Sequence, residues 1–216
     1  DDRYAFLGTF DVFRCFECGH SFLKNSPHMP DSGQIYTDCY PRSSFEPEHF
    51  TPKTFPGGFR SWLNGDACSA CKWVPSEVRI LDIGCGFCEA LAYHRARGCD
   101  VFGVEADENV RTVADKFEFD VKVGRFDPDF YAAESFDYVT LQQVIEHFDD
   151  PVQTLLGVAS ILRSGGHAVV TTPNVYGWGA RTFGRKWINW HVPYHRHFFS
   201  LNSLKRAAEA AGLTVE

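Results

Sequence analysis

Long hydrophobic runs are missing from this sequence of 216 residues, because no apolar stretch approaches the roughly 20 residues that a membrane-spanning helix needs. The first residues show no signal-peptide pattern. Internal repeats and low-complexity tracts are missing as well. The pattern therefore gives no sign of a membrane span, a leader segment or a repeat fold.

A surplus of basic residues is also missing. The sequence has 21 Lys and Arg against 28 Asp and Glu, which gives a formal charge of −7. Binding along a nucleic-acid backbone needs clustered Lys and Arg, so this balance disfavours a nucleic-acid partner. Hydrophobic residues make up 44% and charged residues 23%. These shares are normal for a globular protein and exclude a disordered chain, a collagen and a coiled coil.

Methionine is nearly absent, since Met29 is the only one and the chain begins with Asp1. Residues 213–216 have the character of an opening strand. We therefore expect the full protein to extend at both ends, with its last domain continuing beyond residue 216.

The eight cysteines include three C-x-x-C pairs. Disulfide scaffolds are usually short and secreted, whereas this chain is long enough to build a core without them. We therefore expect reduced thiols and a cytoplasmic protein. Cys15 and Cys18, followed by Gly19, have the spacing of one zinc-binding knuckle. The two further zinc ligands could be Cys68 and Cys71, or Cys39 with a histidine, or residues upstream of the chain. The alternative is a hairpin with free thiols.

Composition divides the chain into three parts. Residues 1–30 carry aromatic residues in short alternating stretches and predict a small β-hairpin module. Residues 31–75 are rich in Pro, Ser and Gly without a clear period and predict a connector and lid. From residue 76 to residue 216, apolar runs alternate with helical stretches, which predicts an α/β domain with a parallel sheet covered by helices on both faces. The runs lie at 80–83, 101–104, 121–123, 138–141 and 168–170.

Capping residues predict where two of the helices begin and end. Asp150 and Pro151 open the first helix, which Gly165 and Gly166 are expected to end. Ser200 caps the second helix, which stops near Gly212.

The strongest chemical signal is a glycine turn between a buried strand and a helix. The turn contains Gly84 and Gly86, where glycine lets the backbone approach a ligand closely and the helix start offers free amides. A second apolar run ends at Glu105, 21 residues after Gly84. An acid at that place can accept hydrogen bonds from both hydroxyls of a ribose. The combination predicts a site for a nucleoside-containing cofactor.

With these motifs the sequence resembles the class I S-adenosylmethionine-dependent methyltransferases. The resemblance rests first on the Leu-Asp-Ile-Gly-Cys-Gly run at 81–86 and covers roughly residues 78 to 216 in order. It implies a Rossmann-like sheet, and the knuckle at 15–19 is similar to the zinc-binding N-terminal module of one branch. That branch often modifies sugars or natural products, so the resemblance implies methyl transfer to a small molecule or glycan, with O-methylation favoured.

The sequence departs from the family pattern at two places. Cys88 replaces the third glycine of the turn, and because cysteine is small we expect the loop to survive. In ubiquinone-type O-methyltransferases a Glu-x-x-Glu-His motif can bind a divalent metal. Here the first glutamate is Gln143, a neutral amide, ahead of Glu146 and His147. We therefore predict no metal at this motif.

The resemblance also implies which residues meet the cofactor, S-adenosylmethionine. Asp82 lies near the methionine amine, Glu105 holds the ribose, and Phe126 offers an apolar surface to the adenine. The implied cofactor residues are Asp82, Gly84, Cys85, Gly86, Glu105, Ala106, Asp107, Arg125, Phe126, Leu141, Gln142 and Gln143.

Methyl transfer needs a group that removes a proton from the acceptor, and histidine titrates near neutral pH. His195 matches a family histidine and is the first candidate, His147 is the second, and Tyr194 could hydrogen-bond the acceptor. An aromatic-rich segment at 174–191 suits sugar rings or flat phenols.

Three other functions compete with this prediction. RNA methylation is disfavoured by the charge of −7 and by the lack of a Lys/Arg cluster. A non-catalytic cofactor-binding protein would keep the same fold. A nicotinamide-dependent dehydrogenase fits poorly, because the acid Asp82 precedes the first glycine. The sequence does not indicate an oligomeric state.

Overall fold

The structure, a computed structural model, describes residues 9–24, 46–52 and 69–216. The chain divides into two compact units. The first, here called the sheet unit, contains the described residues among 46–144 and 157–171. The second, here called the histidine unit, contains residues 9–24, 145–156 and 172–216. Most of the expected connector at 31–75 lies outside the described residues.

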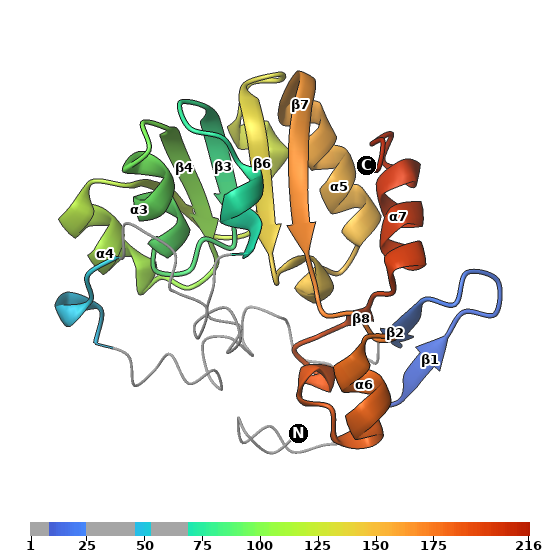
Figure 1. The fold of residues 1–216 in the computed structure, drawn as a ribbon. Coiled ribbons are helices and arrows are strands. Elements are labelled where there is room, and N and C mark those ends of the chain that lie inside the picture. Colours follow the sequence, from blue (N-terminus) through green and yellow to red (C-terminus); the bar gives the residue numbers. More distant parts are fainter. Residues whose placement is uncertain (1–8, 25–45, 53–68) are drawn as a thin grey trace. The chain divides into compact units, whose positions relative to one another are not determined.

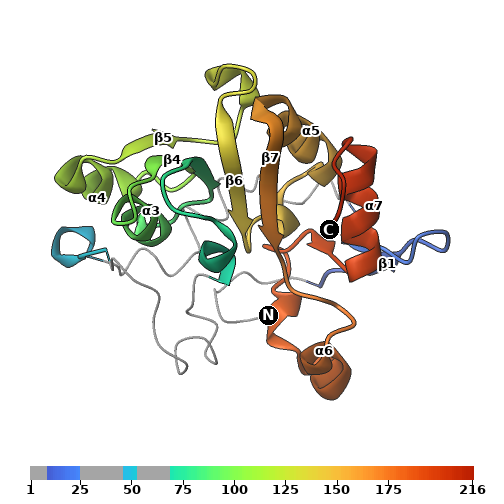
Figure 2. The ribbon, with the colours of Figure 1, turned by 45° about the horizontal axis from the view of Figure 1, so that its top comes forward.

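Five parallel strands build the sheet unit, in the order β5-β4-β3-β6-β7 (Figure 1 and Figure 2). This arrangement confirms the predicted α/β fold. The strands are β3 (Arg79–Ile83), β4 (Asp100–Glu105), β5 (Asp120–Val123), β6 (Phe136–Gln142) and β7 (Leu162–Thr171).

Burial explains why the central strands read as nearly continuous apolar runs. Ile80, Leu81 and Leu141 have no exposed surface, as expected for parallel strands that are covered on both faces. Helices flank the sheet (Figure 1). The helical elements that lie wholly in this unit are η2 (Pro47–His49), η3 (Ser69–Trp73), α3 (Glu89–Arg95), α4 (Val110–Phe117) and η4 (Pro128–Phe130).

The helix α5 (Pro151–Ile161) begins as predicted but ends earlier than expected. Asp150 Oδ1 accepts hydrogen bonds from the amides of Val152 and Gln153, both at 3.0 Å, which confirms the predicted cap. The expected end at 165–166 is wrong. The carbonyl of Ile161 accepts a hydrogen bond from the amide of Ser135, and β7 begins at the next residue.

An antiparallel sheet of three strands lies in the histidine unit. Its strands are β1 (Val12–Arg14), β2 (Ser21–Leu23) and β8 (His197–Phe198). Because Ser21 pairs with Phe198, the N-terminal hairpin shares its sheet with residues near the end of the chain. The other elements are η5 (Ile145–His147), α6 (Trp178–Phe183), η6 (Gly184–Lys186), η7 (Ile188–Trp190) and α7 (Leu201–Ala210).

The helix α7 confirms its predicted cap. Ser200 and Ser203 form a reciprocal capping box, in which each side chain accepts a hydrogen bond from the other residue's amide, at 3.1 and 2.9 Å. The helix ends at Ala210, two residues before Gly212, which has a φ of +77°.

Two further findings concern the described part of the chain. None of its helices is long and apolar enough to cross a lipid bilayer. Six of its cysteines are free thiols: Cys15, Cys18, Cys71, Cys85, Cys88 and Cys99.

Candidate active site

The sequence-predicted cofactor residues gather at one edge of the parallel sheet. All of them lie at, or directly after, the carboxyl end of β3, β4, β5 or β6. In an open parallel sheet this edge is where ligands bind. The structure therefore brings the residues of four separate sequence motifs to one edge.

The glycine turn after β3 folds back onto β4. The amides of Gly84 and Cys85 both donate to the carbonyl of Val104, at 2.8 and 3.0 Å. Gly84 has a φ of +75°, and a Cβ at this position would lie 2.6 Å from Val144 Cγ2. Glycine is therefore required at residue 84 both for its backbone angle and for space.

Glu105, at the end of β4, holds two backbone amides. Its Oε2 accepts a hydrogen bond from Gly86 at 2.8 Å, and its Oε1 accepts one from Asp107 at 3.0 Å. The carboxylate is 8% exposed. Because each carboxylate oxygen has two acceptor positions, Glu105 can hold the loop and still accept from a ligand's hydroxyls.

Asp82 is a buried carboxyl next to this turn. It accepts a hydrogen bond from Thr140 Oγ1 at 2.6 Å. Burial raises the pKa of Asp82 to about 7, and the charges of Glu105 and Glu89 act in the same direction. A cationic group bound beside Asp82 would favour its ionised form.

Other predicted residues at the sheet edge differ in what their side chains do. Phe126 is half-buried and stacks on Tyr131 with ring centroids 6.5 Å apart, whereas Arg125 and Ala106 are exposed. Gln142 Oε1 accepts a hydrogen bond from the amide of Ala70 at 3.3 Å.

The last two predicted residues lie on β6 and just after it. Leu141 belongs to the buried core. The amide of Gln143 donates to the carbonyl of Thr171 at 2.8 Å, and Gln143 Nε2 donates to Thr171 Oγ1 at 3.4 Å.

Cys88 directly precedes α3 and has a φ of +67°. It is fully buried, and its amide donates to the carbonyl of Cys85 at 3.0 Å. The loop therefore keeps the left-handed backbone that favours glycine, with a small cysteine in the glycine's place.

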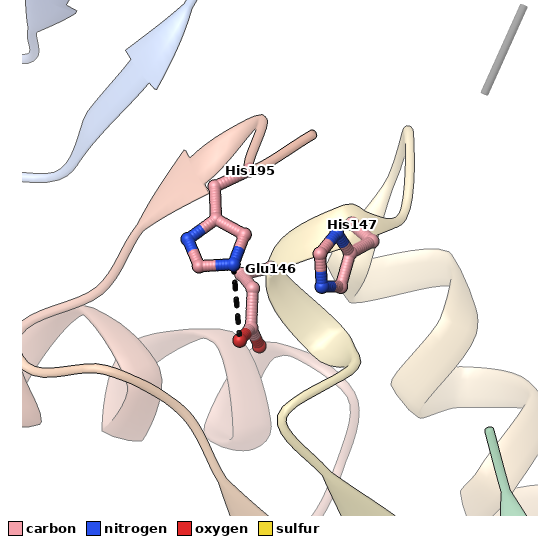
Figure 3. A group of neighbouring side chains, drawn as sticks. All are labelled: Glu146, His147 and His195. Atoms are coloured by element: carbon pink, nitrogen blue, oxygen red, sulfur yellow. Dashed lines mark ion pairs between the residues drawn. The ribbon is translucent and has the colours of Figure 1, made fainter. Parts of the chain in front are cut away.

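In the histidine unit, three side chains point toward one another (Figure 3). Glu146 and His147 belong to η5, and His195 lies two residues before β8. His195 Nε2 lies 3.8 Å from Glu146 Oε1, and the two imidazole rings are 4.7 Å apart in an edge-to-face arrangement. Both sequence-predicted histidines thus meet at one place.

Backbone carbonyls fix both imidazoles of this group. His147 Nδ1 lies 2.8 Å from the carbonyl of Tyr194, and His195 Nδ1 lies 2.9 Å from the carbonyl of Asn189. A carbonyl only accepts hydrogen bonds, so each Nδ1 carries a proton, and in the neutral form of either ring the lone pair lies on Nε2.

Tyr194 contributes to this group through its backbone. The side chain of Tyr194 is 4% exposed and stacks on His191, with ring centroids 4.7 Å apart.

Glu146 stands in the Gln-x-x-Glu-His stretch of the sequence and is not among the predicted site residues. It is 1% exposed, and its Oε2 accepts a hydrogen bond from Thr172 Oγ1 at 2.9 Å. Its Oε1 accepts no hydrogen bond from the described residues. Burial raises the pKa of the Glu146 carboxyl to about 7. Its place next to His147 was the available signal, but nothing in the sequence linked either residue to His195.

The Cys15–Cys18 knuckle forms a tight turn between β1 and β2. Gly19 has a φ of +71°, and its amide donates to the carbonyl of Cys15 at 3.0 Å. Hydrogen bonds from the Cys18 and Glu17 amides lower the pKa of the Cys15 thiol. Of the other suggested zinc ligands, Cys39 and Cys68 lie outside the described residues.

The aromatic segment at 174–191 is partly packed and partly exposed. Trp187 is buried against Trp190, whose ring in turn meets Phe198. Trp178 and Phe183 are 77% and 54% exposed. The segment therefore offers aromatic surface that its own packing does not use.

Comparisons with known proteins show which protein family has this architecture. A family model described as a methyltransferase domain matches residues 45–216. A curated ubiquinone biosynthesis O-methyltransferase from Cupriavidus pinatubonensis is 29% identical over 190 residues, which cover 81% of this chain and 72% of the relative. For several further relatives of that name, the chain spans 45% to 63% of the relative's length.

Solved structures show the same fold. A Thermotoga maritima protein described as an S-adenosylmethionine-dependent methyltransferase, possible histamine N-methyltransferase, is 27% identical with a TM-score of 0.54, covering 66% of this chain and 67% of that one. Phosphoethanolamine N-methyltransferase 2 from Haemonchus contortus, solved with S-adenosylmethionine, has a TM-score of 0.60. It covers 89% of this chain and 46% of that one, and at 19% identity the likeness concerns the fold alone.

Proposed function

The chain belongs to the class I S-adenosylmethionine-dependent methyltransferases, and we propose that it transfers the methyl group to a hydroxyl oxygen of a small-molecule acceptor. Oxygen is proposed as the atom that receives the methyl group because the buried Glu146 lies beside His147 and His195. An alcohol or phenol must lose a proton as it is methylated, and these groups can promote that loss.

The methyl donor is held by the carboxyl edge of the sheet unit. Glu105 accepts the ribose hydroxyls, Asp82 faces the methionine amine, and Phe126 meets the adenine. The Gly84–Gly86 turn is supported in this role by its hydrogen bonds to β4 and to Glu105. The remaining predicted residues line the same edge: Cys85, Ala106, Asp107, Arg125, Leu141, Gln142 and Gln143.

The reaction is an in-line displacement. A lone pair of the acceptor oxygen forms the new bond to the methyl carbon, the sulfur–methyl bond breaks, and its electrons neutralise the sulfonium. The enzyme aligns the two partners and promotes loss of the acceptor's proton. His195 is the first candidate for the group that promotes that loss and His147 is the second, while Tyr194 hydrogen-bonds the acceptor. Glu146 and His147 follow β6 by only a few residues, and Thr172 directly follows β7.

The acceptor is a flat phenol or a sugar ring. Exposed aromatic side chains such as Trp178 and Phe183 suit both classes. The phenol is favoured, because the relatives at about 29% identity carry the name ubiquinone biosynthesis O-methyltransferase.

Cys15 and Cys18 supply half of a structural zinc site in the hairpin. The lowered pKa of Cys15 supports this role, because zinc binds the thiolate form. Zinc content of the purified protein, compared with that of a Cys15→Ser/Cys18→Ser variant, tests it.

The function is tested with methyl-labelled S-adenosylmethionine and a panel of catechols, simple phenols and free sugars. We expect label in the ether-soluble phenolic product, and loss of transfer in Glu105→Ala. Label in an amine acceptor but in no hydroxyl acceptor would contradict O-methylation. Donor binding without transfer to any acceptor would favour a non-catalytic binding protein.

A further inference from the structure

The geometry points to a divalent metal site in the histidine unit, formed by Glu146, His147 and His195. One ligand atom from each residue lies within 4.8 Å of the other two (Figure 3). Two imidazole nitrogens and one carboxylate oxygen form a donor set that suits first-row transition metals such as Mn²⁺, Fe²⁺, Co²⁺ and Zn²⁺. His195 is the ligand that sequence spacing alone could not supply.

Both imidazoles are held as metal-binding histidines usually are. Each Nδ1 donates to a backbone carbonyl, that of Tyr194 for His147 and that of Asn189 for His195. Such a bond fixes the tautomer and orients the ring, so that Nε2 presents its lone pair. In His195 that atom faces Glu146 across 3.8 Å, a gap too long for a hydrogen bond.

The carboxylate of Glu146 provides the third donor of the site. Glu146 is 1% exposed, and one of its oxygens is held by Thr172 while the other accepts no hydrogen bond from the described residues. A buried carboxylate oxygen without a donor is costly unless a cation meets it. A divalent ion shared by Glu146, His147 and His195 would supply that charge and would bind one donor atom from each of the three residues.

Gln143 stands where the Glu-x-x-Glu-His motif has a carboxylate, and for that reason the sequence predicts no metal at this motif. Gln143 instead bonds Thr171 with its side-chain amide. In this chain a different residue, about fifty positions further along, provides the third donor. When bound, the ion would polarise the acceptor hydroxyl and ease its deprotonation. That role rests on the proposed function, whereas ion binding does not.

Binding is tested directly with Mn²⁺, which interacts weakly with thiolates and so avoids the Cys15–Cys18 knuckle. The concentration of free Mn²⁺ is measured by electron paramagnetic resonance while the full chain is titrated with the ion. We expect one bound ion per chain in the wild type and in the control His167→Asn, which removes an exposed imidazole of the sheet unit.

Variants of the site distinguish the residues that bind the ion from a residue that only orients one of them. Thr172→Val removes the hydroxyl that orients Glu146, and we expect binding weakened about tenfold. Glu146→Gln, His147→Asn and His195→Asn each remove a ligand, and we expect a larger loss than in Thr172→Val. S-adenosylmethionine affinity, measured by calorimetry, should stay at the wild-type value in every variant, which shows that each one is folded.

Two results would overturn the inference. One is wild-type Mn²⁺ binding no stronger than that of His195→Asn, with Zn²⁺ giving the same answer. The other is tight binding that survives His195→Asn but is lost in Cys15→Ser/Cys18→Ser. Methyl transfer that persists in EDTA, together with no ion binding, would leave the proposed function intact with His195 as a direct base. Ion binding without any transfer would leave the site intact and refute the function.

Discussion

The sheet unit and the histidine unit hold their candidate residues in different ways. In the sheet unit each functional residue ends a strand or follows it, so a short stretch of sequence carries each part of the site. In the histidine unit, Glu146 and His147 come from η5, Thr172 follows β7, and His195 precedes β8. That site exists only through tertiary contacts.

Local sequence determines the chemistry of the sheet unit more directly than that of the histidine unit. A turn such as Gly84–Gly86 needs particular residues for its own backbone, because positive φ values and close packing leave few alternatives. The rings of His147 and His195 are instead oriented by the carbonyls of Tyr194 and Asn189. Any residue has a carbonyl, so such support leaves no mark on the sequence.

The largest expected effect comes from breaking the tertiary site without touching the sheet edge. His195→Asn should lower kcat by about 100-fold or more, because it removes the group that promotes proton loss. The dissociation constant of S-adenosylmethionine should not change. Steady-state kinetics with a phenolic acceptor and calorimetry measure the two quantities. A weaker donor affinity in this variant would mean that the two sites are not independent.

A second change tests whether the glycine turn of the sheet unit needs glycine at residue 84. Gly84→Ala adds a Cβ that would lie 2.6 Å from Val144 Cγ2, at a φ of +75°. We expect at least about tenfold weaker binding of S-adenosylmethionine, since the turn must shift. The matched control is Gly165→Ala, which has a similar φ of +77° with no atom within 4 Å of the added Cβ.

Comparison of the two variants separates the effect of close packing around the added Cβ from the effect of the positive φ. Both should lose about 1 kcal/mol of unfolding free energy to the positive φ, whereas only Gly84→Ala should lose donor affinity. Equal donor affinities in the two variants would show that close packing at residue 84 is not needed for binding.

A smaller effect concerns pH and the buried Asp82. Its pKa in the folded protein is about 7, above the ordinary value of 3.8. Between these values the folded state binds more protons than the unfolded state, so the free energy of unfolding falls as pH rises from about 4 to 7. The slope due to this group is at most about 1.4 kcal/mol per pH unit.

Asp82→Asn should remove that part of the pH dependence. Denaturant unfolding of wild type and variant at several pH values, without S-adenosylmethionine, measures the difference, and changes at other groups cancel. Parallel curves for the two proteins over pH 4 to 7 would show that Asp82 keeps an ordinary pKa.

Much of the fold could be predicted from sequence for physical reasons. Buried parallel strands give apolar runs, and all five predicted strands are present. Asp150 and Ser200 act as caps because their side chains satisfy amides only two or three residues away. The end of α5 at Ile161 was missed, because it depends on the carbonyl of Ile161 meeting Ser135 from a distant part of the chain.

The residues of the candidate site also differ in whether the sequence alone could predict their contacts. The glycine turn and Glu105 were predictable, since strand order and spacing alone bring them together. Glu146 as a partner of His195 was not, nor was the pairing of Ser21 with Phe198. Both contacts join residues that are far apart in sequence, and no periodic pattern encodes them.

If the chain is a methyltransferase of the proposed kind, the carboxyl edge of the sheet unit binds S-adenosylmethionine through Glu105. Calorimetric titration of the purified protein and of Glu105→Ala measures this binding. We predict a single site in the wild type and at least about tenfold weaker binding in the variant, because both ribose hydroxyls lose their acceptor. No heat of binding in the wild type, or equal affinity in the two proteins, would contradict the claim.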